Sequence, residues 1–111
     1  MGIQDWSENI ILVNLEPEPQ LGEELKTVTR IARDRRECNA VIDFTNAEMV
    51  TSSSLAQLLR LQKTLRDKAG KLILCGLSKR TKGIFVVTGL ETVFDFAEEQ
   101  FVALASFQMT V

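Results

Sequence analysis

The sequence contains no histidine and only two cysteines among its 111 residues. The absence of histidine excludes serine–histidine and cysteine–histidine catalysis, imidazole metal ligands and the usual proton shuttle near neutral pH. Cys38 and Cys75 are too few and too isolated for a disulfide framework or a zinc site. We therefore predict no metal site and no cofactor, and only lysine or carboxylate chemistry remains open for an enzyme.

The sequence also lacks an excess of basic over acidic residues and lacks long apolar runs. The formal net charge is -2, from 13 basic and 15 acidic residues, so nothing in the composition indicates nucleic-acid binding. No apolar run approaches the roughly 20 residues that span a bilayer. The first residues include Asp5 and Glu8 and do not resemble a signal peptide. We expect a cytoplasmic protein without membrane insertion.

The length and composition are those of one globular domain. A hydrophobic fraction of 45% with 25% charged residues argues against disorder. A chain of 111 residues can bury one modest core, so we expect a single domain over residues 1–111.

Short apolar runs alternate with longer amphipathic segments. Strands are predicted at 3–6, 10–13, 40–44, 71–75 and 93–96. Helices are predicted from Leu21 to about Arg33, Arg35 and Arg36, from Thr51 or Ser52 to about Ala69, over 78–87 and over 98–107. The fold class is therefore α/β, with a mainly parallel but mixed sheet of four to five strands and about four α-helices. The first two strands form a hairpin at the antiparallel edge. Cys38 and Cys75 then lie at opposite ends of the sheet as buried thiols.

The run Thr51-Ser52-Ser53-Ser54 is the strongest candidate site, because it follows a strand and opens a helix. A helix N-terminus stabilises negative charge, so a phosphate on one of these hydroxyls would be tolerated by the fold. The same charge would oppose the docking of an apolar or acidic partner. Simple helix capping and packing of small residues would also explain the run.

Other polar groups match no known site. Gly76, Gly83 and Gly89 lack the spacing of a phosphate-binding loop. Asp43 and Glu48 have no metal-binding spacing and are better explained by solvation or a turn.

The sequence around the hydroxyl run resembles STAS domains of the anti-sigma factor antagonist type. The similarity lies in Val41-Ile42-Asp43-Phe44-Thr45, in Met49-Val50-Thr51-Ser52-Ser53-Ser54-Leu55 and in Leu58-Leu59. It continues in the strand 71–75 and in 84–94, where a Gly-Leu pair precedes a Phe-containing strand, and covers about residues 8 to 107. The family has Asp where this chain has Thr51, and Gly where it has Ser54.

The resemblance implies a regulatory protein-binding module that is not an enzyme. Such a module acts in signal transduction and regulates transcription. In such families the antagonist binds an anti-sigma factor, often also a serine kinase. Phosphorylation of a serine breaks the complex and a phosphatase restores it. The serine after the family's Asp maps onto Ser52, with Ser53 as the neighbouring alternative. The partner-binding residues that the resemblance suggests are Thr51, Ser52, Ser53, Ser54, Asp43 and Gln57.

The two departures from the family pattern motivate an alternative. The chain would then be a STAS scaffold that does not switch, as a subunit of a signalling assembly or of a lipid-transport ATPase complex.

Overall fold

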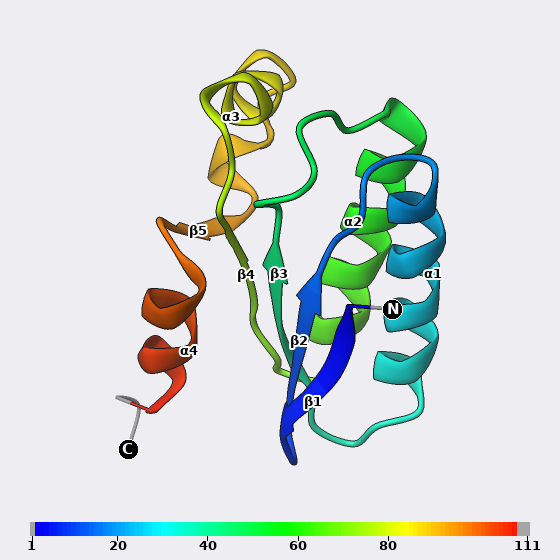
Figure 1. The fold of residues 1–111 in the computed structure, drawn as a ribbon. Helices are drawn as coiled ribbons and strands as arrows, with labels where there is room; N and C mark the ends of the chain where they lie inside the picture. Colours follow the sequence, from blue (N-terminus) through cyan, green and yellow to red (C-terminus); the bar gives the residue numbers. More distant parts are fainter. Residues whose placement is uncertain (1, 109–111) are drawn as a thin grey trace.

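The computed structural model describes residues 2–108, which form a five-stranded sheet with helices on both faces (Figure 1). The strands are β1 (Ile3–Ser7), β2 (Ile10–Asn14), β3 (Asn39–Asp43), β4 (Leu72–Cys75) and β5 (Asp95–Ala97). The helices are α1 (Gln20–Arg33), α2 (Ser52–Arg66), α3 (Lys79–Val87) and α4 (Gln100–Gln108), with a 3-10 turn η1 (Leu90–Thr92). The predicted α/β fold with a mainly parallel sheet is confirmed.

The strands lie in the order β1-β2-β3-β4-β5, and only β1 is antiparallel to its neighbour. Central β3 pairs with β2 and β4, so that Val41 lies opposite Leu12 on one side and Ile73 on the other. Because the four parallel strands run the same way, their carboxyl ends share one edge of the sheet. The connections that enter α1, α2, α3 and α4 all start at that edge, where open α/β sheets usually carry their sites.

Alternate residues of the strands enter two cores, as the period of two in a strand requires. Ile11, Val13 and Ile42 face the larger core, which α1 and α2 cover, and Ile10, Leu12 and Val41 face the smaller one. Figure 1 shows α1 and α2 together on one face and α4 on the other. In the smaller core, α4 contributes Ala103 and Leu104.

Phe85 anchors α3 at the carboxyl edge of the sheet. Its ring packs edge-to-face against Phe44, Phe94 and Phe96, with centroid distances of 6.5, 5.6 and 5.5 Å. Such aromatic pairs contribute about 0.5–1.5 kcal/mol each beyond the area that they bury. They fix α3 relative to the loop that follows β3.

Several element ends differ from the predicted ones. Helix α2 ends at Arg66 rather than near Ala69, because Ala69 is left-handed (φ 58°) and the Gly70 N–H turns back to the Leu65 carbonyl at 2.7 Å. The last strand begins two residues later than predicted, because Val93 closes the 3-10 turn over 90–92 by donating its N–H to the Leu90 carbonyl at 3.0 Å. Helix α1 ends at Arg33, so that Arg35 and Arg36 belong to the following connection.

Both cysteines are free and buried, as predicted. Cys38 directly precedes β3 and Cys75 ends β4, at opposite ends of the sheet. Burial, together with the negative charge of Asp43, raises the pKa of the Cys75 thiol to about 12. None of the helices within residues 2–108 combines the length and the apolar character that spanning a bilayer requires.

Candidate functional site

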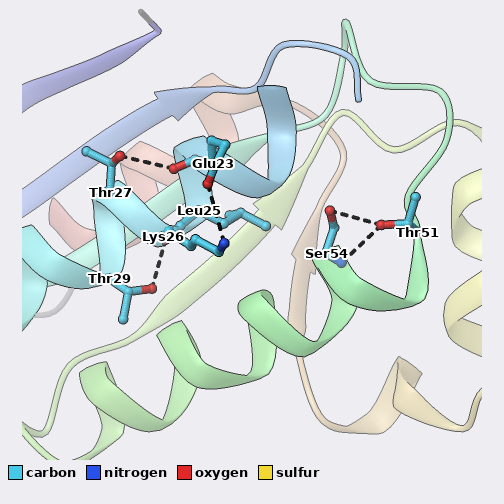
Figure 2. A network of polar contacts seen from close by, with 7 residues as sticks. All are labelled: Glu23, Leu25, Lys26, Thr27, Thr29, Thr51 and Ser54. Atoms are coloured by element: carbon cyan, nitrogen blue, oxygen red, sulfur yellow. Dashed lines mark hydrogen bonds and ion pairs between the residues drawn. The ribbon is translucent and has the colours of Figure 1, made fainter. Parts of the chain in front are cut away.

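The hydroxyl run opens α2, with Thr51 as the N-cap residue. Thr51 has an extended backbone (φ -78°, ψ 162°), and its Oγ1 accepts the Ser54 N–H at 3.1 Å. The Thr51 hydroxyl in turn donates to Ser54 Oγ at 3.2 Å (Figure 2). Ser54 is only 2% exposed. These two hydroxyls therefore serve the local structure, by capping the helix and by bonding each other.

Ser52 and Ser53 differ from their two neighbours. Both are exposed, and neither hydroxyl forms a hydrogen bond with any residue in the described part of the chain. They occupy the first turn of α2, where the backbone N–H groups lack helical acceptors and the helix dipole favours negative charge. Of the four hydroxyl residues, these two remain available for chemistry or for a partner.

Glu18 brings a carboxylate to the same helix end from the connection between β2 and α1. Its Oε2 accepts the Thr51 N–H at 2.9 Å. Partial burial by itself would raise the pKa of Glu18, but hydrogen bonds from Thr51, Ser54 and Gly22 outweigh this effect and lower the pKa. A negative charge is therefore already bound at the α2 N-terminus. No sequence pattern marks Glu18, because the two prolines of Glu16-Pro17-Glu18-Pro19 indicate only a connection between a strand and a helix.

A hollow of about 310 Å³ lies between the starts of α1 and α2. It is lined by Glu18, Pro19, Gly22, Glu23, Lys26, Thr51, Ser53, Ser54 and Gln57. Ser53 and Gln57 thus share it with two carboxylates and the Lys26 ammonium, whereas Ser52 does not line it. The helices approach closely here, since a side chain added at Gly22 would place its Cβ 3.1 Å from Ser54 Oγ.

Asp43 lies at the carboxyl end of β3 and is directed inward rather than toward the hydroxyl run. It is 9% exposed, and its Oδ1 accepts both the backbone N–H and the hydroxyl of Thr45, at 2.8 and 2.5 Å. Its Oδ2 accepts the Gln100 amide at 2.9 Å, and the same amide nitrogen donates to Asn14 Oδ1 at 2.9 Å. Asp43 therefore orients the start of the loop that leads to α2, with help from residues far away in the sequence.

The loop before α2 carries an exposed apolar side chain. Met49, two residues before Thr51, is 58% exposed. The loop is held by Thr81, whose buried hydroxyl donates to the Glu48 carbonyl at 2.9 Å. The apolar pair Met49-Val50 is expected to pack in the core, but only Val50 is buried, so Met49 adds an exposed apolar contact point to the loop that leads to Ser52.

Comparisons with known proteins agree with this arrangement. The STAS domain family model matches residues 9–102. A protein of Bordetella bronchiseptica, named as the candidate anti-sigma factor antagonist BtrV, is 28% identical over 86 residues, which cover 78% of this chain and 74% of BtrV.

Two solved structures share the fold. The anti-sigma factor antagonist SpoIIAA in its unphosphorylated form superposes with a TM-score of 0.82 at 16% identity, covering 98% of this chain and 96% of SpoIIAA. A STAS domain protein from Planctomyces limnophilus superposes with a TM-score of 0.76 at 19% identity, covering 87% and 89%. With a family match over most of its length, this chain belongs to the STAS domain family and resembles the anti-sigma factor antagonists within it.

Proposed function

We propose that this protein is a regulatory binding module of the anti-sigma factor antagonist type, and that phosphorylation of Ser52 releases its partner. The observation that carries the proposal is that the four hydroxyl residues 51–54 are not equivalent in the structure. Thr51 and Ser54 are hydrogen-bonded to each other, whereas the Ser52 hydroxyl at the start of α2 is exposed and has no hydrogen-bond partner within residues 2–108. The proposed partners are an anti-sigma factor or serine kinase-like protein and a phosphatase, in the cytoplasm.

The helix N-terminus suits a phosphate that must disturb an interface without disturbing the fold. A phosphoserine adds about -1.5 to -2 charges at neutral pH, which the free N–H groups and the dipole of α2 would accept. A partner that packs on exposed Met49 and on the uncharged hydroxyls would meet that charge directly. The fold would keep its stability while the complex would lose its affinity.

The surroundings favour Ser52 over Ser53 as the modified residue. Ser53 shares its hollow with Glu18, Glu23 and Lys26. Because Lys26 is already paired with Glu23 at 3.5 Å, a phosphate on Ser53 would lie near two carboxylates with no unpaired cation to balance it. Ser52 lies outside that hollow and would carry its phosphate toward solvent or a partner. Like charges in close proximity are destabilising, and this cost falls on Ser53.

Glu18 also supports retention of the switch despite the change of the family's Asp to Thr51. A carboxylate still contacts the first N–H of the helix start, but it comes from another segment of the chain. Thr51 meanwhile keeps the capping role, because its Oγ1 accepts the Ser54 N–H. The negative charge and the cap are thus supplied by two residues instead of one.

The alternative, a STAS scaffold without a switch, is favoured by one feature. Ser54, at the family's Gly position, is buried and bonded to Thr51 beside the close approach of α1 at Gly22. These contacts stiffen the helix start that a kinase would need to reach.

The test is binding of a purified kinase-like anti-sigma factor from the same organism, measured by calorimetry. We expect Ser52→Asp to weaken binding at least tenfold and Ser52→Ala to retain it. Ser53→Asp and Ser52→Asn serve as controls for charge position and for size. Equal affinity of all four variants would contradict the switch and support the scaffold, and mass spectrometry of the native protein would show whether Ser52 carries phosphate.

A further inference from the structure

A second hollow, of about 480 Å³, lies at the start of α1. It is lined by Glu16, Pro19, Gln20, Glu23, Glu24 and Thr27. It adjoins the hollow at the hydroxyl run, because Pro19 and Glu23 line both. Figure 2 shows Glu23 and Thr27 one turn apart on α1, joined by the hydrogen bond from the Thr27 hydroxyl to the Glu23 carbonyl. Its volume lies in the range of pockets that bind small molecules or single side chains.

Glu24 is the buried member of this group. It is 3% exposed, whereas Glu16, Gln20 and Glu23 are exposed, so Glu24 forms the floor and the others the rim. Its Oε1 accepts the Glu16 N–H at 2.7 Å. Its Oε2 is buried and has no hydrogen-bond partner among the residues that the structure describes. A buried carboxylate oxygen without a donor is costly, so a donor that enters from the hollow and reaches this atom would be stabilising.

The charge of the hollow indicates what that donor is. Glu16, Glu23 and Glu24 line it, and none of its lining residues is basic. Lys26 does not neutralise the floor, because it pairs with the exposed Glu23 at 3.5 Å. Within residues 2–108, no three acidic, cysteine or histidine side chains gather closely enough to hold a metal ion. An organic cation therefore fits better than a metal ion.

We propose that this hollow, the Glu24 pocket, binds an alkylammonium or guanidinium group. The N–H groups of the cation donate to Glu24 Oε2, and its apolar stem packs against the ring of Pro19, in the way that Lys and Arg stems cover apolar surface. The cation is either a free small amine or a basic side chain of a protein. The second source rests on the proposed function, because that protein would be docked across the adjacent hydroxyl run.

The test is an NMR titration of the ¹⁵N-labelled full chain with n-butylguanidinium, with n-butylurea as the neutral analogue of the same shape. We expect saturable shifts of the amides in residues 16–27, a millimolar dissociation constant and at least tenfold weaker binding of the urea. Glu24→Gln keeps the oxygen that accepts the Glu16 N–H but removes the charge, and should weaken guanidinium binding at least tenfold. Equal affinity for the urea, or equal affinity of the variant, would overturn the proposal.

Two further arms complete the experiment. If Glu24→Gln does not fold, Glu23→Gln on the exposed rim takes its place and removes one of the three negative charges. This variant should weaken guanidinium binding at least twofold, and unchanged affinity would refute the site. A peptide, acetyl-Ala-Arg-Ala amide, separates the two sources. Binding as tight as that of n-butylguanidinium assigns the pocket to a protein side chain, and exclusion of the peptide assigns it to a small amine. Neither arm involves Ser52, so failure here is distinct from failure of the switch.

Discussion

Replacement of Thr51 by Asp would restore the residue that the family has at this position. It tests whether the Glu18 carboxylate already supplies the negative charge that this Asp would bring to the N-terminus of α2. Asp caps helices about as well as Ser and slightly better than Thr, which is worth a few tenths of a kcal/mol. A negative charge near the α2 N-terminus adds about 0.3–1 kcal/mol. By these local rules alone, Thr51→Asp should stabilise the protein.

Glu18 reverses this expectation. Its carboxylate accepts the Thr51 N–H at 2.9 Å, so a carboxylate at residue 51 would lie close to it. Two unit charges about 4 Å apart interact by about 1 kcal/mol in bulk water and about 4 kcal/mol at an effective dielectric of 20. Glu18 is half-buried, and we expect a repulsion of about 1–2 kcal/mol between these limits. The net effect of Thr51→Asp is then a loss of about 0.5–1 kcal/mol.

The assay is a double-mutant cycle by urea denaturation with wild type, Thr51→Asp, Glu18→Gln and the double variant. Glu18→Gln retains an oxygen for the Thr51 N–H, and in that background Thr51→Asp should stabilise by about 0.5–1 kcal/mol. The coupling energy should be about 1–2 kcal/mol and should shrink in 1 M salt, where the Debye length is about 3 Å. A coupling below about 0.3 kcal/mol, the limit of additivity for independent sites, would refute the reasoning.

The pH dependence gives the same comparison a second readout. The pKa of Glu18 in the folded protein lies below its usual 4.5, so its charged form favours folding. This contribution is present above pH 4.5 and is lost as the pH falls through the folded pKa. Wild type should therefore lose stability relative to Glu18→Gln as the pH falls below about 4.5. A constant difference between the two proteins down to low pH would contradict this assignment.

Two further predictions concern Gly76 and Cys75, at the carboxyl end of β4. Gly76→Ala should destabilise the protein by about 2 kcal/mol or more in urea unfolding, because Gly76 has φ +69° and the new Cβ would lie 2.5 Å from Asp43 Oδ1. Gly83→Ala in α3 is its matched control, since no atom of the described residues beyond the adjoining backbone of α3 lies within 4 Å of the new Cβ, and it should stabilise the protein by about 0.5–1 kcal/mol. Cys75, with its pKa raised to about 12, should not react with a disulfide reagent at pH 8 until the protein unfolds, and rapid labelling of the native protein would contradict its burial.

The order of the secondary structure followed from the sequence because it depends on local patterns. Apolar runs such as 40–44 and 71–75 alternate with amphipathic segments, and this alternation is sufficient for a parallel sheet with an antiparallel edge. The start of α2 at the hydroxyl run was equally local, since capping involves residues three apart, as Thr51 and Ser54 show. The ends of helices were less predictable, because Ala69 adopts a left-handed conformation that its residue type does not indicate.

Only the tertiary structure decided which polar groups are available. Ser52 and Ser54 look alike in the sequence, but Ser54 faces α1 at Gly22 while Ser52 faces solvent. Glu18 reaches Thr51 across 33 residues, and Gln100 reaches Asp43 across 57. Glu24 is buried, and the connection after β2 reaches it by donating the Glu16 N–H. The sequence by itself determined where hydroxyls and carboxylates occur along the elements. Packing between distant segments determined which of them are exposed, paired or left without a partner, because no local pattern records a contact between residues so far apart.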